Sequence, residues 1–132
     1  MSPSAIITGI GVDIVEIDRI AGTLARYGER FERKIFTERE IAYCRLTPSR
    51  TAERYAARFA AREAFAKAIG TGIRNGFRWR EVAVAKERSG RPLLQLGGAT
   101  AARFPDLVFH LSLSHSQKDA IAMVVAERRP AA

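Results

Sequence analysis

The 132-residue sequence predicts an α+β fold in which an antiparallel sheet packs against one long helix and several shorter ones. Two observations indicate this class: the expected helices are largely segregated from the strands along the chain, and the expected strands are mostly linked as hairpins. A doubly wound sheet would instead alternate strands and helices throughout. No repeat or Pro/Gly-rich linker divides the chain, so we expect one domain over residues 1–132, with an ordered core at about 5–127.

The first strand is expected at residues 5–15, AIITGIGVDIV. Residues of one face alternate with those of the other along a strand. One face therefore carries Ile6, Thr8, Ile10, Val12 and Ile14, and the opposite face carries Gly9, Gly11 and Asp13.

Two helices are expected next. Apolar residues at helical spacing predict an amphipathic helix that ends at about residue 27. Thr37-x-x-Glu40 has the pattern of a capping box and predicts a short helix towards Arg45, which Pro48 interrupts.

The longest helix is expected at about 51–69, an Ala-rich stretch that Gly70 ends as a C-cap. A strand at 79–86 and its partner at Leu93–Leu96 form a hairpin around a Ser89-Gly90 turn. A short helix near 98–103 precedes two further strands, 107–114 and 119–126, joined by a turn at Gln117-Lys118.

Composition narrows the class of protein. A net charge of +8 favours polyanionic partners: nucleic acid, an anionic membrane, a phosphorylated small molecule or an acidic protein. The single cysteine, Cys44, excludes an intrachain disulfide and a multi-cysteine zinc site. No apolar run approaches the roughly 20 residues that span a bilayer, and the N-terminus lacks a signal-peptide pattern. We therefore expect a cytoplasmic protein with no membrane partner.

Asp13 is the first candidate site residue, because it is a carboxylate within an otherwise apolar strand. The glycines on its face remove side chains, so another backbone or a ligand can approach closely. The alternative is a structural ion pair between Asp13 and an arginine.

Glu63 is the second candidate. It shares one i, i+4 row of the long helix with Tyr55, Phe59 and Lys67, so the row changes from aromatic to charged. That change suggests a helix face that passes from the core into a polar site. The alternative is a surface Glu–Lys pair, and the neighbouring Arg58 and Arg62 are either solvated or directed at an anion.

The third candidate segment is HLSLSHS, residues 110–116. Alternation places His110, Ser112 and Ser114 on one face, and His115 on the apolar face at the end of the strand. A hydroxyl-rich strand that ends in histidine can offer hydrogen-bond donors to phosphate, although a lone histidine is often structural. The sequence contains no P-loop or Rossmann fingerprint.

Together, these segments resemble the holo-[acyl-carrier-protein] synthase family of 4'-phosphopantetheinyl transferases. The resemblance covers about residues 6–127 and rests on four ordered motifs: GIGVDIVEIDRI (9–20), RFAAREAFAKAIGTGI (58–73), SGRP (89–92) and LSLSHS (111–116). Two positions depart mildly from the family pattern. Arg62 stands where the family often has Lys, and Ser116 where Thr is common.

The resemblance implies transfer of the 4'-phosphopantetheine arm of coenzyme A to a serine of apo acyl carrier protein, which supports fatty acid biosynthesis. It implies a homotrimer with active sites between subunits. Asp13 and Glu63 match the Mg²⁺ ligands, and with Lys67 they form the implied catalytic set. The residues implied for coenzyme A are Arg58, Lys67, Pro92, Ser114, His115 and Ser116, with Pro92 in a hairpin that closes the adenine pocket of a neighbouring subunit.

Residue chemistry agrees with these implications. A diphosphate under attack needs charge neutralisation and alignment, and Mg²⁺ is usually held by one or two carboxylates. Lys67, one turn from Glu63, can reach the same diphosphate. For the general base two alternatives stay open. One is Glu63, directly or through a water molecule held by the metal ion, and the other is a water molecule near Glu40.

The expected docking surface for the acidic carrier protein is the basic first helix and the residues after it, with Arg19, Arg26 and Arg30 as the implied contacts. A basic nucleic-acid-binding protein is the competing class. We do not expect it, because stacking, zinc-finger and RNP patterns are absent from the sequence and it leaves Asp13 and Glu63 unexplained. A transferase for carrier domains within a larger synthase is a nearer alternative that the sequence does not separate.

Overall fold

The computed structural model describes residues 6–74 and 76–129, so the predicted first position of the first strand, Ala5, lies outside the described residues. The elements in chain order are β1 (Ile7–Glu16), α1 (Ile17–Tyr27), α2 (Glu29–Ile35), α3 (Glu38–Arg45), η1 (Pro48–Arg50), α4 (Thr51–Ala68), η2 (Trp79–Glu81), β2 (Val82–Lys86), β3 (Pro92–Leu96), α5 (Gly98–Arg103), β4 (Leu107–His115) and β5 (Asp119–Arg128). The α+β prediction is confirmed.

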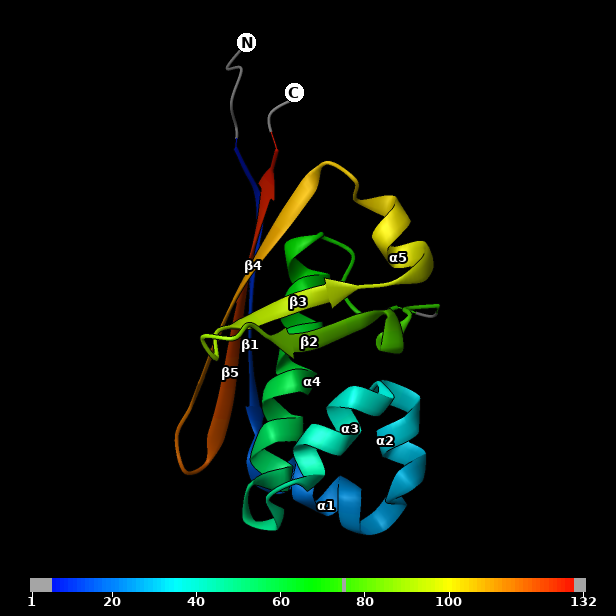
Figure 1. Ribbon diagram of the computed structural model, residues 1–132, viewed down its shortest axis with the longest axis vertical. Coiled ribbons are helices and arrows are strands. Elements are labelled where there is room, and N and C mark those ends of the chain that lie inside the picture. The colour runs from blue at the N-terminus through cyan, green and yellow to red at the C-terminus, as the bar shows by residue number, and fades with distance from the viewer. Residues whose placement is uncertain (1–5, 75, 130–132) are drawn as a thin grey trace.

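The strands form two antiparallel sheets: a three-stranded sheet of order β1-β5-β4 and the β2–β3 hairpin. Figure 1 shows α4 running along the three-stranded sheet, with the hairpin crossing over α4 and with α1, α2 and α3 gathered at the end opposite the termini. Among the described residues, no helix is long and apolar enough to cross a membrane.

One predicted boundary needs correction, and one helix was not predicted. Residues 79–81 form a 3₁₀ turn rather than the start of a strand, so β2 begins at Val82. The helix α2 was not predicted. It begins directly after Gly28, whose positive φ of 52° ends α1 and reverses the chain so that Glu32 and Ile35 become buried. Seven residues show too few turns for their periodicity to be recognised in a sequence.

The capping box is confirmed. The Thr37 hydroxyl accepts a hydrogen bond from the Glu40 amide, and Glu40 Oε1 accepts one from the Thr37 amide at 3.0 Å. Gly70, with a φ of 83°, follows the C-cap residue Ile69 of α4, and its amide donates to the Lys67 carbonyl at 3.0 Å. The capping box begins α3 and Gly70 ends α4, each where its sequence signal predicts.

The close approach of α4 to β1 explains the two glycines of the first strand. A Cβ placed on Gly11 would lie 1.9 Å from the Ala64 carbonyl oxygen, and one on Gly9 would lie 1.9 Å from the Ala68 oxygen. The facing row of the helix, Ala56, Ala60, Ala64 and Ala68, is buried and small. The glycines therefore admit another backbone, that of α4, and this contact aligns β1 with the helix that carries Glu63 and Lys67.

Gly11→Ala is expected to destabilise the fold by about 3 kcal/mol or more, because the new methyl group meets backbone that cannot rotate away. Gly22→Ala is the matched control, since a Cβ there meets nothing within 4 Å among the described residues of neighbouring segments. That control should be neutral or stabilise by roughly 0.5–1 kcal/mol, as usual for Gly→Ala within a helix. Urea denaturation of both variants checks the difference; equal stabilities would contradict the packing argument.

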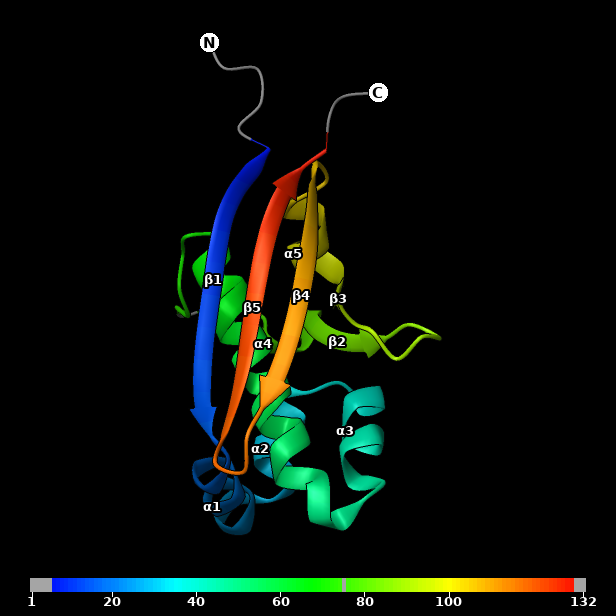
Figure 2. The same ribbon diagram turned by 90° about the vertical axis from the view of Figure 1, so that its left-hand side faces the viewer.

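The other face of the three-stranded sheet is exposed and apolar. Ile10, Val12 and Ile14 of β1 are 62%, 54% and 61% exposed, and Ile121 and Met123 of β5 are exposed beside them. Figure 2 shows this sheet in front of α4, with no described helix on the near side. Ile10, Val12 and Ile14 thus point away from the core of this chain, whereas Val15 of the same strand is buried in it.

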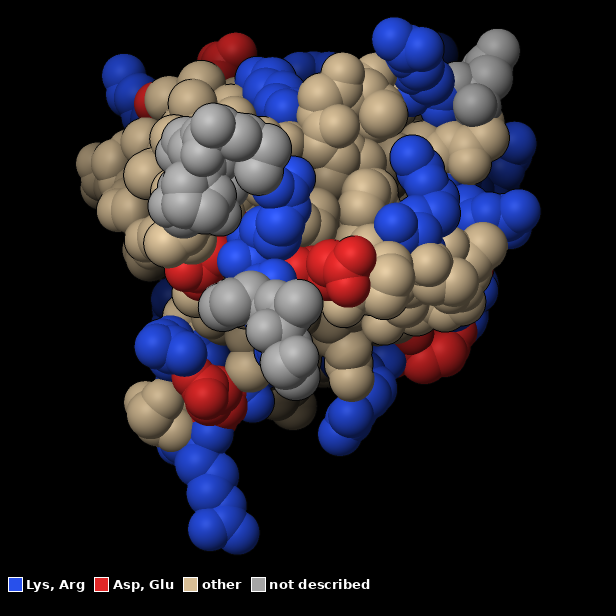
Figure 3. Space-filling view, turned by 90° about the horizontal axis from the view of Figure 1, so that it is seen from above, with Lys and Arg blue, Asp and Glu red and all other residues tan. Residues whose placement is uncertain are grey.

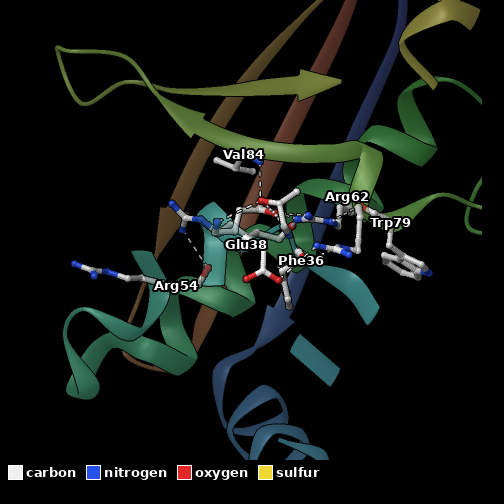
Figure 4. A network of polar contacts seen from close by, with 10 residues as sticks. Phe36, Glu38, Arg54, Arg62, Trp79 and Val84 are labelled. Atoms are coloured by element: carbon white, nitrogen blue, oxygen red, sulfur yellow. Dashed lines mark hydrogen bonds and ion pairs between the residues drawn. The ribbon is translucent and has the colours of Figure 1, made fainter. Parts of the chain in front are cut away.

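A buried ion pair joins α3, α4 and the β2–β3 hairpin. Arg62 is fully buried, and its guanidinium donates to both carboxylate oxygens of Glu40 and, through Nε, to the Trp79 carbonyl at 2.9 Å. Glu40 Oε2 also accepts from the Val84 amide at 3.0 Å. Figure 4 shows this cluster, with Val84 on one side and Trp79 beside Arg62. Arg62 is therefore neither solvated nor directed at an external anion.

Candidate active site

Asp13, Glu63 and Lys67 come together where β1 passes α4. Lys67 Nζ lies 3.2 Å from Asp13 Oδ1 and donates to the Val12 carbonyl at 3.0 Å. Gly9 faces Ala68 and Gly11 faces Ala64, so the strand and the helix run in opposite directions, and Asp13 continues the same row. The glycine contacts thus hold the Asp13 carboxylate beside the charged end of the aromatic-to-charged helix row.

Asp13 and Glu63 are close enough for their negative charges to interact. The pKa of Glu63 is raised above its ordinary value, first by burial and then by the negative charge of Asp13, against the opposing charges of Lys67 and Arg19. Two carboxylates that repel each other attract a cation to the space between them. Across residues 6–74 and 76–129, no cluster of three or more His, Cys, Asp or Glu is present. The donor set fits an ion such as Mg²⁺, which needs only one or two carboxylates and takes its other ligands from substrate and water.

A second part of the site is a groove between α3, α4, the hairpin and the end of β4. Of the predicted residues, Arg58, Pro92, Ser114 and His115 line it. The full lining is Tyr43, Arg50, Glu53, Arg54, Ala57, Arg58, Lys86, Gly90, Pro92, Leu113, Ser114 and His115. Pro92 borders the groove of its own chain.

His115 lies at the end of the groove formed by β4, beside the carboxylate of Glu53. His115 Nε2 lies 3.4 Å from Glu53 Oε2, and Ser114 points from the opposite face of β4. Ser116 does not line the groove. Its hydroxyl accepts from the Lys118 and Asp119 amides at 3.2 Å each and so stabilises the β4–β5 turn.

The groove and the carboxylate pair are connected through α4. Arg58 and Glu63 are five residues apart on this helix, which corresponds to about 7.5 Å along its axis. Lys67, Glu63 and Asp13 are not among the residues that line the groove. The site therefore has two parts on one helix: a carboxylate pair with a lysine, and a basic groove with a histidine.

Glu40 is not available to hold a water molecule for catalysis. It is 2% exposed, and both its oxygens accept hydrogen bonds from Arg62 as well as from backbone amides. Burial opposes its ionisation, but Arg62 and the amides of Thr37 and Val84 outweigh burial, so the pKa of Glu40 lies below its ordinary value. The structural interpretation of Glu40 is confirmed.

The predicted docking residues Arg19, Arg26 and Arg30 are all exposed. Arg19 is close enough to Glu63 for its charge to lower the pKa of that carboxyl. Basic side chains are not confined to this end, because Figure 3, a view from the end that carries the termini, also shows many Lys and Arg and few acids. Both ends of the molecule are basic, so charge alone does not single out the surface of α1. That surface differs because Arg19 lies beside the Asp13–Glu63 pair.

Sequence reasoning missed several residues of the groove, namely Tyr43, Arg50, Glu53, Arg54 and Lys86. Arg54 and Arg58 are spaced i, i+4 and so share a helix face, which is the one signal that the sequence offered. Tyr43 and Lys86 come from α3 and β2, and only the tertiary fold brings them to α4.

Comparisons with known proteins identify the family and the fold. The sequence model of the 4'-phosphopantetheinyl transferase superfamily matches residues 9–124. A holo-[acyl-carrier-protein] synthase of Koribacter versatilis is 45% identical over 124 residues, which cover 92% of this chain and 98% of that protein. The holo-[acyl-carrier-protein] synthase structure from Neisseria meningitidis aligns with a TM-score of 0.84 at 34% identity, covering 92% of this chain and 99% of that one. The Bacillus anthracis enzyme in complex with CoA (3',5'-ADP) aligns with a TM-score of 0.79 at 38% identity, covering 94% and 99%.

Proposed function

The chain belongs to the 4'-phosphopantetheinyl transferase superfamily, and from this premise we propose that it is a magnesium-dependent holo-[acyl-carrier-protein] synthase. It transfers 4'-phosphopantetheine from coenzyme A to a serine of apo acyl carrier protein. The serine Oγ bonds to the phosphorus that carries pantetheine. The bond from this phosphorus to adenosine 3',5'-bisphosphate breaks, and the leaving oxygen keeps the electron pair. We expect this reaction to support fatty acid biosynthesis in the cytoplasm.

The observation that carries the proposal is the Asp13–Glu63 pair beside Lys67. Asp13 and Glu63 would hold Mg²⁺, which supplies positive charge to the diphosphate when bound. The Lys67 ammonium is a second positive charge for the same diphosphate. Glu63 is the proposed acceptor of the serine proton, directly or through a water molecule that Mg²⁺ would hold.

The groove is the proposed site for the adenosine end of coenzyme A. Arg58 and His115 face it with Ser114 nearby, and its cations match a phosphate monoester. The related Bacillus anthracis enzyme was solved with CoA (3',5'-ADP), which carries the same group. The 3'-phosphate would then lie in the groove and the diphosphate towards Glu63 and Lys67 on the same helix. Ser116 contributes through the turn that presents His115 rather than through direct contact.

Intact-mass spectrometry tests the proposal. Incubation of apo acyl carrier protein with coenzyme A, Mg²⁺ and this protein should add the mass of one phosphopantetheine group, and EDTA should prevent the gain. Absence of any gain across a panel of free carriers and carrier domains would reject the transferase function. The same panel separates a free carrier from a carrier domain within a larger synthase.

We further propose a homotrimer that buries the apolar face of the β1-β5-β4 sheet. Ile10, Val12, Ile14, Ile121 and Met123 form one exposed surface, and no described segment of the chain covers it. A contiguous apolar surface of this kind is typical of a protein–protein interface. A second copy is the proposed occupant, because the face also ends at Ser114 and therefore borders the groove. The contribution of Pro92 to a neighbouring groove is part of this proposal.

Ile10→Glu combined with Met123→Glu is expected to convert the trimer into monomers, because charge replaces apolar area at the proposed interface. Leu46→Glu is the control, since Leu46 is 72% exposed but lies between α3 and η1. Sedimentation velocity measures the assembly state. A monomeric wild type, or a trimer that survives the double substitution, would refute this interface.

Arg26→Glu is expected to raise the KM for the carrier protein by about tenfold or more while the KM for coenzyme A stays unchanged. Arg26 lies two turns from Arg19 on the same face of α1, so it tests docking without direct influence on Glu63. Arg19→Glu should raise the same KM and also reduce kcat, because Arg19 lies close enough to change the Glu63 pKa.

Arg103→Glu on α5 makes the same charge change at the opposite end of the molecule and serves as the control. Equal effects of Arg26→Glu and Arg103→Glu would exclude α1 as the docking surface.

A further inference from the structure

Tyr43 stands at the centre of three cations in the basic groove. Its ring centroid lies 4.3 Å from Arg54 Cζ, 4.5 Å from Arg58 Cζ and 4.5 Å from Lys86 Nζ. Arg54 also donates to the Tyr43 carbonyl at 3.0 Å, and Lys86 donates to the Tyr43 hydroxyl. One aromatic side chain of α3 therefore contacts two arginines of α4 and a lysine of β2.

These three cations are poorly compensated. The carboxylate that lines the groove, Glu53, is already paired with Arg50 at 2.7 Å and faces His115 at 3.4 Å. Arg58 is 5% exposed, yet its Nε atom has no hydrogen-bond partner within residues 6–74 and 76–129, and neither does the buried Nε of Arg54. A buried N–H group without an acceptor is unfavourable. Clustered guanidinium donors of this kind fit an anion, and the doubly charged phosphate monoester is the best match.

Without Tyr43, the three cations would move apart, because their positive charges repel one another and water solvates each of them. Lys86 is the last residue of a five-residue strand and is exposed, so its long side chain is otherwise free to turn into water. The electron-rich face of an aromatic ring attracts cations within about 6 Å, and a shared ring offsets part of their mutual repulsion. The tyrosine hydroxyl adds a directed contact to Lys86, which an aromatic ring alone does not provide.

We propose that Tyr43 is the positioning residue that holds Arg54, Arg58 and Lys86 as one cationic wall for the 3'-phosphate of coenzyme A. This inference rests on the proposed function and adds to it the residue that confers selectivity for a 3'-phosphorylated adenosine. Tyr43 itself lines the groove beside these cations, and its proposed role is to position them rather than to bind the phosphate. The Tyr43 pKa agrees with this arrangement: burial opposes ionisation, but Lys86 and the two arginines lower the pKa below its ordinary value.

The test compares coenzyme A with 3'-dephospho-coenzyme A in wild type, Tyr43→Phe and Tyr43→Leu. Tyr43→Leu should raise the KM for coenzyme A by about tenfold, with kcat within about threefold of wild type, and leave the KM for the dephospho substrate unchanged. Tyr43→Phe should show a smaller rise, because it keeps the ring and loses the hydroxyl contact to Lys86. In a Lys86→Met background, Tyr43→Phe should have no further effect.

A general loss of structure would lower kcat and raise the KM of both substrates together, and that result would overturn the inference. An unchanged ratio of the two KM values in Tyr43→Leu would overturn it as well. Calorimetric binding of adenosine 3',5'-bisphosphate and adenosine 5'-monophosphate separates this inference from the proposed function. If the wild type transfers nothing but binds the bisphosphate more tightly, and Tyr43→Leu removes that preference, the positioning role stands and the transferase proposal fails.

Discussion

Asp13→Asn and Glu63→Gln are each expected to reduce the rate of phosphopantetheine transfer by at least about 10²–10³-fold, while the protein stays folded. Both side chains lie at the edge of the core, and each substitution keeps the size of the group and removes its charge. A diphosphate cannot be attacked efficiently unless positive charge lies against it, and one carboxylate holds a cation less well than two. Intact-mass assays give the rate, and circular dichroism confirms the fold.

Binding of Mg²⁺ gives a second readout that does not depend on turnover. Calorimetric titration should show weaker Mg²⁺ binding in both variants, whereas Glu16→Gln, an exposed carboxylate at the end of the same strand, should bind as wild type does. Full activity of Glu63→Gln would contradict both its metal-binding and its proton-accepting role. If the variants lost activity but bound Mg²⁺ as wild type does, Asp13 and Glu63 would not be metal ligands, and their role would be limited to positioning the substrate.

The raised pKa of Glu63 sets the sign of the pH dependence. Glu63 must be ionised to attract a cation or accept a proton, so Mg²⁺ binding and activity should both weaken towards acid pH, where Glu63 becomes protonated. In the metal-free protein, Asp13→Asn should lower the Glu63 pKa because it removes a repelling charge, and Lys67→Met should raise it because it removes an attracting one. Carbon-13 NMR of the Glu63 carboxyl measures both shifts, and shifts of the opposite sign would contradict the assigned proximity.

Arg62→Met is expected to destabilise the protein by about 3–5 kcal/mol, because it leaves the Glu40 carboxylate buried without its partner. Adding Glu40→Gln should recover part of this loss, since the uncompensated charge is then gone while Oε1 still accepts from Thr37. Arg39→Met, at an exposed neighbouring position on α3, should change stability by less than about 0.5 kcal/mol. Urea denaturation compares the four proteins.

Acid pH offers an independent check on the Glu40–Arg62 pair. The Glu40 pKa is lowered in the folded wild type, so its contribution to stability is present above the ordinary carboxyl pKa and lost as the pH falls through the lowered one. In Arg62→Met, burial without the arginine should raise the Glu40 pKa instead. The stability difference between wild type and Arg62→Met should therefore shrink towards low pH. A difference independent of pH would show that the charge of Glu40 is not the cause.

Local signals explain why most elements could be predicted. The Thr37–Glu40 capping box, the Gly70 end of α4 and the turn at Gly90 depend on backbone geometry within a few residues, and each lies where the sequence places it. The helix that was missed, α2, is too short for its periodicity to be recognised. It is stabilised by buried contacts to other segments, such as the hydrogen bond from the Tyr55 hydroxyl to Glu32. Propensity is a weak guide where tertiary contacts decide.

The candidate site residues also divide into those that local patterns indicate and those that only tertiary contacts reveal. Asp13, Glu63 and His115 could be found because each interrupts a regular pattern, and Lys67 because it shares a helix row with Glu63. Tyr43 and Lys86 interrupt nothing in their own segments and become visible only where α3 and β2 meet α4. For Arg62 the sequence was misleading in the other direction. It suggested a solvated or anion-binding arginine, whereas the structure buries Arg62 against Glu40.

The α+β class and the face of β1 that carries Asp13 were determined by the sequence alone, because alternation and helical spacing are properties of neighbouring residues. Only the tertiary structure decided what the glycines of that face approach, namely the backbone of α4. It also decided that Arg62 is a buried partner of Glu40 and that the isoleucines of β1 point outward. These outcomes depend on contacts between segments far apart in the chain, and a periodic pattern shows that a face is shared without showing what packs against it.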